Sequence, residues 1–386
     1  MRITDGNQIK LLRNGAEYFP ALASAILAAQ RVVHLQTYIY ALDETGLRIG
    51  NALMQAARNG VEVNVLLDGF GSKDLPKSYV NRLEQAGVQV MFYRPKISPW
   101  TLKTRRLRRL HRKVAVIDDQ IGFVGGINII DDQHVPNQTS PRVDYALQIA
   151  GPVVMEMVES VNQLWRSMAW LNLQRVKQHS DDEKQQAIAI AIAKTAGMKV
   201  AYVIRNNVLH RRDIETAYLD AIHQASSEIL IANAYFLPGK RFRNALVAAA
   251  KRGVSVKLLL QGRKEYFLMF ATHAFYPYFL RAGVEIYEYR KSFMHSKVAV
   301  IDSDWATVGS SNIDPFSLLL SLEANLVVLN AQFAAELKQE IVTSIEHAYR
   351  ITPDTWAHES SIKRVLSWFA YGLVKFFLGV IGYTND

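Results

Sequence analysis

The chain repeats a polar pattern that in its second half reads Met294-His-Ser-Lys-Val-Ala-Val-Ile-Asp302 and then Val308-Gly-Ser-Ser-Asn312. The first half contains Leu110-His-Arg-Lys-Val-Ala-Val-Ile-Asp118 and then Val124-Gly-Gly-Ile-Asn128. In both copies an aspartate follows the histidine by seven positions, and an asparagine follows it by seventeen. We expect a chain that keeps one polar spacing twice to bring both copies to one place.

The apolar centre of each copy predicts a buried strand, because it is rich in β-branched residues. Side chains alternate between the faces of a strand, so His295 and Lys297 point the same way, with Cα atoms about 7 Å apart, and suit one small anion. Asp302 has the opposite parity and is expected to brace backbone or a neighbouring side chain. The Gly/Ser turn lets backbone N–H groups come close, and Asn312 adds a neutral donor.

Composition limits the class of protein and of partner. The chain has 386 residues, of which 49% are hydrophobic, so it is long enough for two domains with sizeable cores. Its net charge of +10 favours anionic partners, namely nucleic acid, a membrane surface or a phosphorylated substrate. Cysteine is absent, which excludes disulfides and thiol nucleophiles. The first residues hold no apolar run, so neither a signal peptide nor an N-terminal membrane helix is predicted.

Strands and helices alternate along the first half and recur downstream, which predicts an α/β fold. Asn51-Ala-Leu with Gly60-Val-Glu-Val matches Asn244-Ala-Leu with Gly253-Val-Ser-Val. The chain is therefore an internal duplication. We expect each half to be an α/β domain with a mixed, mostly parallel sheet flanked by helices, and the site to lie at the interface between the domains.

The sequence divides into four parts under this interpretation. The two domains span 1–173 and 198–350, a polar linker region spans 174–197, and a C-terminal amphipathic helix spans 351–386. The first half also carries about a dozen extra residues between Tyr93 and His111.

Two matching histidines can divide the work on a phosphodiester. One attacks phosphorus to give a phosphohistidine, while the other, protonated, gives its proton to the leaving alkoxide. The side chains of Lys113, Lys297, Asn128 and Asn312 would surround the equatorial oxygens, where charge develops. No cluster with metal-ligand spacing is found, so neither a metal nor another cofactor is expected.

Each imidazole also needs a carboxylate to orient it. Glu323 lies on the strand expected after the second motif, and Asp144 is its counterpart in the first half. On parity these two are better candidates than Asp118 and Asp302.

The spacing H-x-K-x4-D-x6-G-[SG]-x-N, complete in both copies, resembles the phospholipase D superfamily. The stretches Leu67-Asp-Gly-Phe-Gly-Ser72 and Ala232-Asn-Ala-Tyr-Phe-Leu-Pro238 are similar to bacterial cardiolipin synthases, and the likeness is closest to the short B-type, which lacks two N-terminal membrane helices. The resemblance covers about residues 7–350. It implies two phospholipase D-like domains and transfer of a phosphatidyl group to the hydroxyl of phosphatidylglycerol, through a covalent phosphatidyl-histidine, with release of glycerol.

The resemblance also implies roles for particular residues. It places His111 as the nucleophile and His295 as the acid and base. The predicted catalytic set is His111, Lys113, Asp118, His295, Lys297 and Asp302. The predicted substrate-binding set is Asn128, Asn312, Ser310, Asp144 and Glu323. Gly126 stands where the second copy has Ser310, so the two turns do not both offer a hydroxyl.

Two segments bear on the partner. Residues 103–113 hold seven basic residues in eleven, which would draw a lipid headgroup or nucleic acid toward His111. In 361–383, Arg364, Ser367, Tyr371 and Lys375 form a narrow polar stripe on an otherwise apolar helix, with Trp368 as an interface anchor. A core helix is the alternative interpretation of this tail.

We expect anionic phospholipid and a membrane surface as partners, no nucleic acid, and a peripheral position on the cytoplasmic side of the cell membrane. Two other functions stay open, hydrolysis by the same residues and cleavage of nucleic acid.

Overall fold

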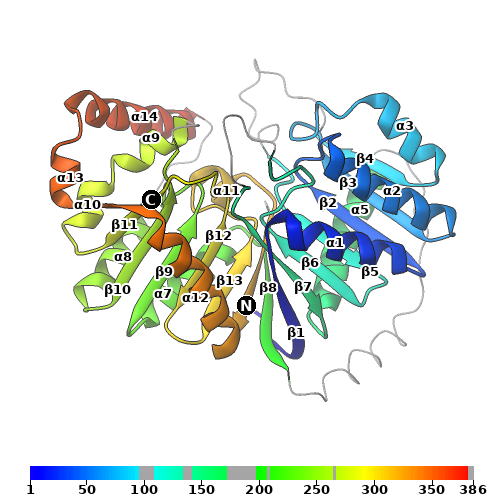
Figure 1. Ribbon diagram of the computed structural model, residues 1–386, viewed down its shortest axis with the longest axis horizontal. Coiled ribbons are helices and arrows are strands. Elements are labelled where there is room, and N and C mark those ends of the chain that lie inside the picture. The colour runs from blue at the N-terminus through cyan, green and yellow to red at the C-terminus, as the bar shows by residue number, and fades with distance from the viewer. Residues whose placement is uncertain (95–107, 134–140, 172–196, 207–208, 264–266, 381–386) are drawn as a thin grey trace.

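The computed structural model describes the chain except residues 95–107, 134–140, 172–196, 207–208, 264–266 and 381–386. The predicted linker, apart from Gly197, and most of the extra residues before His111 therefore lie outside the described residues. Within the described part, the chain forms two halves of alternating strands and helices (Figure 1).

The first half contains the following elements: β1 (Thr4–Arg13), α1 (Asn14–Ala28), β2 (Val32–Thr37), α2 (Glu44–Arg58), β3 (Glu62–Asp68), α3 (Lys77–Gln85), β4 (Gln89–Tyr93), β5 (Lys113–Ile117), β6 (Ile121–Gly125), β7 (Tyr145–Ala150) and α5 (Val154–Leu171). The alternation of strands and helices expected for this half is confirmed.

The second half repeats this order with additions: β8 (Met198–Arg205), α7 (Asp213–Gln224), β9 (Glu228–Asn233), α8 (Lys240–Lys251), β10 (Ser255–Gln261), α9 (Phe267–His273), α10 (Tyr276–Leu280), β11 (Glu285–Tyr289), β12 (Lys297–Ile301), β13 (Trp305–Gly309), α11 (Pro315–Leu319), β14 (Glu323–Leu329), α12 (Ala331–Glu346), β15 (Ala348–Ile351), α13 (Pro353–Ala357) and α14 (Ser361–Val380).

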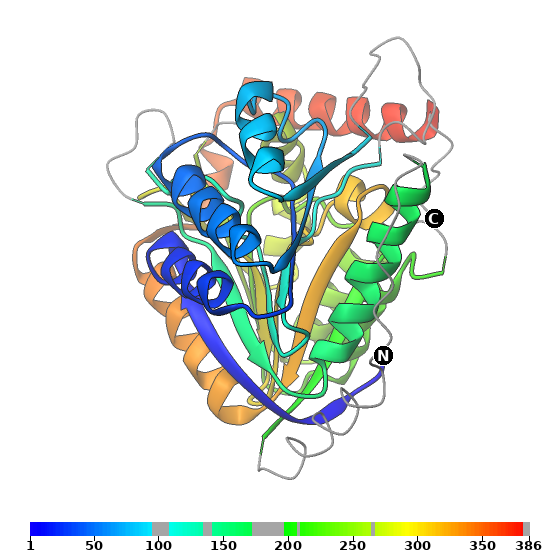
Figure 2. The ribbon, with the colours of Figure 1, turned by 90° about the vertical axis from the view of Figure 1, so that its right-hand side faces the viewer.

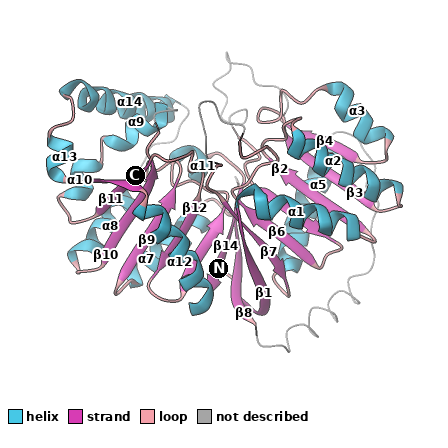
Figure 3. Cartoon of the chain, in the orientation of Figure 1, coloured by secondary structure: helices cyan, strands magenta, loops and turns pink. Residues whose placement is uncertain are grey.

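The strands join into one mixed sheet of order β15-β11-β10-β9-β12-β13-β14-β8-β1-β7-β6-β5-β2-β3-β4. Figure 3 shows two wings of strands that meet near β14, β8 and β1. The expected α/β duplication is confirmed, but the expectation of a mostly parallel sheet is wrong. Parallel pairing is confined to β2-β3-β4 and β9-β10-β11, where helices connect the strands. The other strand pairs are antiparallel, and some of them, such as β5 and β6, are joined by short turns that cannot make a parallel crossover.

Three large apolar clusters, with a smaller fourth against α5, hold the layers together. In the first half, α1, α2 and α3 cover one face of β2 and β3, and in the second half α7 and α8 cover one face of β9 and β10. The third cluster lies between the wings and draws on both halves, including α5 and α12. Figure 2 shows this arrangement from the side.

The motif strands are buried on both faces. In β12, Val298 and Val300 face the cluster between the wings, whereas Ala299 and Ile301 face the outer cluster. The strand β5 has the same alternation. The apolar side chains of each motif strand therefore pack on both faces of the sheet, and this packing fixes the register of the strand.

The motif aspartates anchor the far end of each hairpin. Asp118 accepts backbone hydrogen bonds from Gln30, Arg31 and Val32 at 2.8–3.0 Å, just before β2 begins. Asp302 does the same before β9, where it accepts from the backbone N–H groups that precede and open that strand, at 2.8–3.0 Å. Both aspartates have a φ of 52°, a left-handed conformation that Asp tolerates better than most residues.

Asp302 offers a test of this anchoring. Backbone hydrogen bonds outweigh burial and lower its pKa from 3.8 to about 2. Because the folded pKa is depressed, this stabilisation is fully present above pH 4 and is lost as pH falls toward 2. We expect Asp302→Asn to lower the free energy of unfolding by about 2 kcal/mol at pH 7, as measured by urea denaturation. The difference from wild type should shrink below pH 4.

The control is Asp304→Asn, which removes the same charge from an exposed position in the same turn. Equal losses from both variants, or a loss from Asp302→Asn that does not depend on pH, would contradict the anchoring role.

Candidate active site

Both motifs open at the same end of the sheet. Lys297 pairs with Asn233 at the C-terminal end of β9, and Glu323 pairs with Arg205 at the C-terminal end of β8. In the first half, Lys113 pairs with Gly125 at the C-terminal end of β6. The polar ends of the two motifs therefore meet where the wings join.

Two short parallel bridges cross between the halves at this end. One joins Leu110 to Leu322, and the other joins Val143 to Met294. The backbone N–H of His111 donates to the carbonyl of Leu322 at 3.0 Å, and that of His295 donates to the carbonyl of Val143 at 2.8 Å. Each histidine is thus fixed to the backbone of the other half.

The side chains of the two histidines also contact the opposite half. Nδ1 of His111 lies 2.9 and 3.1 Å from the two carboxylate oxygens of Glu323. Nδ1 of His295 lies 2.7 Å from Oδ2 of Asp144. Each imidazole is therefore oriented by a carboxylate from the opposite half, and both carboxylates are buried. The two acidic residues expected to orient the imidazoles lie where that role requires.

An imidazole held through Nδ1 has Nε2 left for chemistry. An ionised carboxylate accepts a hydrogen bond from Nδ1–H and so selects the tautomer in which Nε2 carries the lone pair. Burial raises the pKa of Asp144 to about 6, so this carboxyl group is still mostly ionised at neutral pH. An imidazole held in this way can serve as nucleophile, acid or base.

Two lysines lie beside the imidazoles. Lys113 is 2% exposed and donates to the carbonyl oxygen of His111 at 2.6 Å, and Lys297 is fully buried and donates to that of His295. Burial and mutual repulsion lower the pKa of Lys113 to about 7, and burial lowers that of Lys297 to about 8. A bound anion would favour the charged form of both ammonium groups.

Burial and the neighbouring positive charges also shift the pKa values of the imidazoles. Burial is the largest cause that lowers the pKa of His111, and Glu323 opposes it. The pKa of His295 is lowered further, by burial and by the positive charges of Lys297 and Lys113. Without an anion, both imidazoles are therefore neutral at pH 7.

Comparison with known proteins agrees with this geometry. The family model described as cardiolipin synthase, PLD-like domain, matches residues 22–165 and 218–344. The chain belongs to this family. Cardiolipin synthase B of Salmonella typhimurium is 41% identical over 343 residues, which cover 87% of this chain and 80% of the relative. Cardiolipin synthase B of Escherichia coli K12 is 39% identical, with the same coverage.

Solved structures agree on the fold. The phosphatidylserine synthase of Haemophilus influenzae superposes with a TM-score of 0.70 at 15% identity, covering 97% of this chain and 95% of that one. The resemblance to B-type enzymes of the phospholipase D superfamily is confirmed by the curated relatives.

Several residues expected in this cardiolipin synthase-family site hold other groups of the site in place. Ser310 is fully buried and donates to Glu323 at 2.5 Å, so its hydroxyl braces the carboxylate. A Cβ at Gly126 would lie 2.2 Å from a carboxylate oxygen of Asp144, which explains why the two turns differ. Asn128 accepts from the backbone N–H of Ile39 at 3.0 Å and holds the segment after β2.

Asn312 differs from Asn128. Its side-chain carbonyl oxygen is buried without a hydrogen-bond partner among the described residues. This oxygen is an acceptor and would not itself bind a phosphate oxygen, so the substrate-binding role of Asn312 stays a prediction.

Asp118 and Asp302 do not belong to the site. Seven strand steps separate each from its histidine, roughly 23 Å along an extended chain. Their inclusion in the catalytic set is not supported by the structure, because their carboxylates bind backbone at the opposite end of the strand. The interpretation based on strand parity, which expected Asp302 to brace backbone or a neighbouring side chain, agrees with these contacts.

Four residues at the site were not identified from the sequence. The Tyr38 ring contacts the His111 imidazole edge-on at 5.0 Å, and the Phe293 ring stacks with His295 at 6.0 Å. The buried carboxylate of Asp68 accepts from the backbone N–H of Leu110 at 2.8 Å. Arg142 lies beside Phe293, 5.8 Å from its ring centroid. No local pattern marks these positions, because they reach the site through tertiary contacts.

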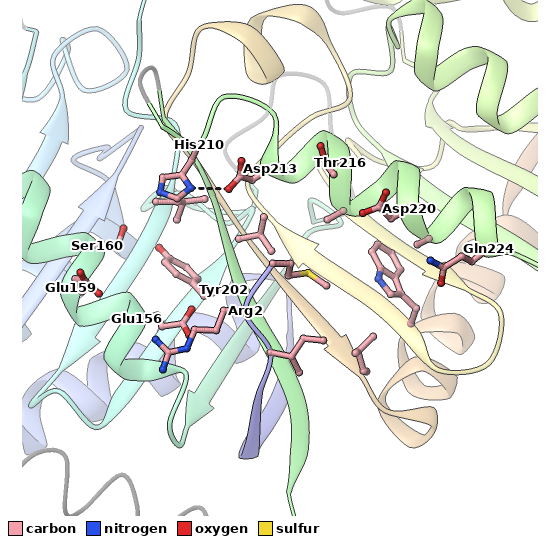
Figure 4. Close-up of a pocket in the computed structure, with 18 of the residues that line it drawn as sticks. Arg2, Glu156, Glu159, Ser160, Tyr202, His210, Asp213, Thr216, Asp220 and Gln224 are labelled. Atoms are coloured by element: carbon pink, nitrogen blue, oxygen red, sulfur yellow. Dashed lines mark hydrogen bonds and ion pairs between the residues drawn. The ribbon is translucent and has the colours of Figure 1, made fainter.

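A cavity of about 770 Å³ lies away from this site, across β8 between α5 and α7 (Figure 4). Glu156, Glu159, Asp213 and Asp220 line it, so its charge opposes an anionic phosphodiester. None of its lining residues belongs to either motif.

The contact between Glu323 and His111 predicts a measurable shift in the pKa of His111. In Glu323→Gln, the attraction that favours the protonated imidazole is lost, so the pKa of His111 should fall further below its ordinary value. Histidine NMR titration measures this directly, and His295, which Asp144 orients, is the internal control. A rise in the pKa of His111, or equal shifts at both histidines, would contradict the pairing.

Proposed function

We propose that this protein is a cardiolipin synthase that transfers a phosphatidyl group from one phosphatidylglycerol to a hydroxyl of a second. One observation carries the proposal. Two imidazoles, each oriented through Nδ1 by the opposite half, share a single site with two buried lysines. The named relatives of the chain, which are cardiolipin synthases, supply the substrate class.

In the first step, Nε2 of His111 attacks phosphorus and forms a P–N bond. The P–O bond to the headgroup glycerol breaks, and the departing oxygen takes a proton from Nε2 of His295. The negative charge of the phosphodiester raises the pKa of His295 toward the value that this role needs. Glycerol leaves, and the phosphatidyl group stays on His111.

In the second step the roles of the acid and base reverse. His295 takes the proton of the acceptor hydroxyl, whose oxygen bonds to phosphorus, and the P–N bond breaks with its electrons returning to His111. Lys113, Lys297 and the Asn312 amide stabilise the charge on the equatorial oxygens. The absence of a required metal stays a prediction.

This mechanism predicts the products and the effect of each histidine. Purified protein with phosphatidylglycerol vesicles and EDTA should form cardiolipin and glycerol, identified by mass spectrometry, with a bell-shaped pH dependence. His111→Ala and His295→Ala should each lower the rate by about three orders of magnitude or more. His295→Ala should retain a trace of trapped phosphatidyl-enzyme that His111→Ala lacks.

The matched control is His347→Ala, an exposed histidine outside both motifs. Phosphatidic acid as the sole lipid product would make the protein a hydrolase. Cleavage of DNA without any lipid product would overturn the proposal.

The C-terminal helix supports attachment to a membrane. α14 packs its narrow face on the second half, with Ser367, Ala370 and Val374 buried, and the ring of Tyr371 contacts that of Phe275 at 4.8 Å. The predicted polar stripe thus partly faces the protein.

The opposite face of α14 is apolar and exposed. Its side chains are 42–72% exposed: Ile362, Val365, Leu366, Trp368, Phe369, Leu373 and Phe376. A contiguous apolar face of this kind is typical of a membrane or partner surface, and a lipid substrate favours the membrane. A helix buried in the core would not leave this face open.

The position of α14 suits this role. It lies along the upper edge of the molecule in Figures 1 and 2, and α11, which begins three residues after Asn312, lies on the same side of the strands in Figure 1. None of the helices in the described part of the chain has the length and hydropathy of a membrane span. We therefore propose peripheral attachment through α14, and the cytoplasmic side of the cell membrane stays a prediction.

Replacing apolar side chains on this face should weaken attachment. Phe369→Asp combined with Phe376→Asp removes two large apolar groups and adds charge, so vesicle binding should fall on the order of tenfold or more in a flotation assay. Activity on short-chain lipid below its critical micelle concentration should be retained. Leu27→Asp, at an exposed apolar residue of α1, is the control. Undiminished binding of the double variant would exclude α14 as the anchor.

A further inference from the structure

The two bridges that cross between the halves place matching pairs beside each imidazole. In one bridge, His111 lies opposite Glu323 and Arg109 lies opposite Ser321. In the other bridge, His295 lies opposite Asp144, and Phe293 lies opposite Arg142. One arginine therefore stands two pairs outward from each imidazole–carboxylate contact, on the histidine's own strand in the first case and on the carboxylate's strand in the second.

The two arginines have different surroundings. The side chain of Arg109 is 11% exposed and lies 3.6 Å from the fully buried carboxylate of Asp68. That carboxylate also binds the backbone N–H of Leu110, so Arg109 is part of the support that holds His111 in place. Its charge is compensated within the protein.

Arg142 lies on the other side of the site. Its side chain has the same parity as Asp144, so the two point to one side with Cα atoms about 7 Å apart. The guanidinium lies 5.8 Å from the ring centroid of Phe293, which stacks on His295. Its positive charge reaches both His295 and Lys297, where it helps to lower the pKa of each group.

The proposed reaction brings a second anionic group to this side of the site. It joins two lipids, and each carries one phosphodiester. Lys113 and Lys297 lie beside the reacting phosphorus, whereas the acceptor brings a second phosphate on the far side of its three-carbon glycerol. The acceptor hydroxyl must reach His295, the group that takes its proton, so the acceptor phosphate lies near His295 as well.

We propose that Arg142 binds the phosphate of the acceptor lipid and directs the acceptor hydroxyl to Nε2 of His295. This inference rests on the proposed function. In the step that it assists, the hydroxyl proton passes to His295, the oxygen bonds to phosphorus, and the P–N bond to His111 breaks with its electrons returning to the imidazole. An arginine suits the task because its guanidinium can donate two parallel hydrogen bonds to one phosphate.

Arg142 would then select the acceptor. Water and simple alcohols carry no phosphate and gain nothing from this side chain, whereas phosphatidylglycerol gains a charge-assisted contact. The side chain therefore favours synthesis over hydrolysis without altering the chemistry at phosphorus.

The experiment measures competition between two acceptors. Phosphatidylglycerol vesicles are incubated with ethanol, and the ratio of cardiolipin to phosphatidylethanol is followed by mass spectrometry. Arg142→Gln should lower this ratio roughly tenfold or more, the usual effect of losing a charged hydrogen bond. Arg142→Lys keeps the charge but cannot make the two parallel hydrogen bonds, so its ratio should lie between those of Arg142→Gln and wild type. Arg350→Gln, at a surface arginine paired with Glu285 at 3.0 Å, should match wild type.

The outcomes separate the two proposals. If wild type makes cardiolipin and Arg142→Gln keeps the wild-type ratio, the role of Arg142 is overturned and the proposed function stands. The same holds if Arg142→Lys shows as low a ratio as Arg142→Gln. If wild type makes phosphatidylethanol or phosphatidic acid but no cardiolipin, the proposed function itself fails.

Discussion

The crossed contacts between imidazole and carboxylate constrain the whole molecule. Glu323 orients His111 and Asp144 orients His295, and each contact joins one half of the chain to the other. Neither half on its own holds a motif histidine together with its carboxylate partner. The apolar cluster between the wings, the pairing of β1 with β8 and the two backbone bridges all keep these contacts within hydrogen-bond distance. Buried carboxylates without their partners would be costly, so the site itself opposes separation of the halves.

The two halves have similar backbone folds around the site but differ in several side chains. Ser310 braces the longer Glu323, whereas Gly126 leaves room for the shorter Asp144. Tyr38 contacts His111, and Phe293 stacks on His295. These differences give the two imidazoles different electrostatic surroundings. In the proposed reaction one histidine bonds to phosphorus, whereas the other serves both the leaving group and the acceptor, and unequal surroundings favour this division of roles.

The sequence predicted those parts of the molecule that depend on local spacing. The β-branched run predicted the motif strands, and parity separated Lys297 from Asp302. The parallel character of the sheet was overestimated because the helices that make parallel crossovers stand out in a sequence, whereas the turns of antiparallel pairs are short. Arg142 could not be identified, because its relation to His295 depends on a bridge between segments about 150 positions apart. For α14 the pattern predicted an amphipathic helix, but only packing shows which face is open.

Substrate charge and proton placement are coupled in this site. Lys113 and Lys297 lower the pKa of His295, and the neighbouring Arg142 adds to the effect. An incoming phosphodiester brings negative charge among these same groups and reverses part of that effect, so a proton returns to an imidazole when substrate is present. The lysines need the anion too, because burial has lowered their own pKa values. Under the proposed function, the substrate would therefore supply the negative charge that favours the protonated imidazole on which its own cleavage depends.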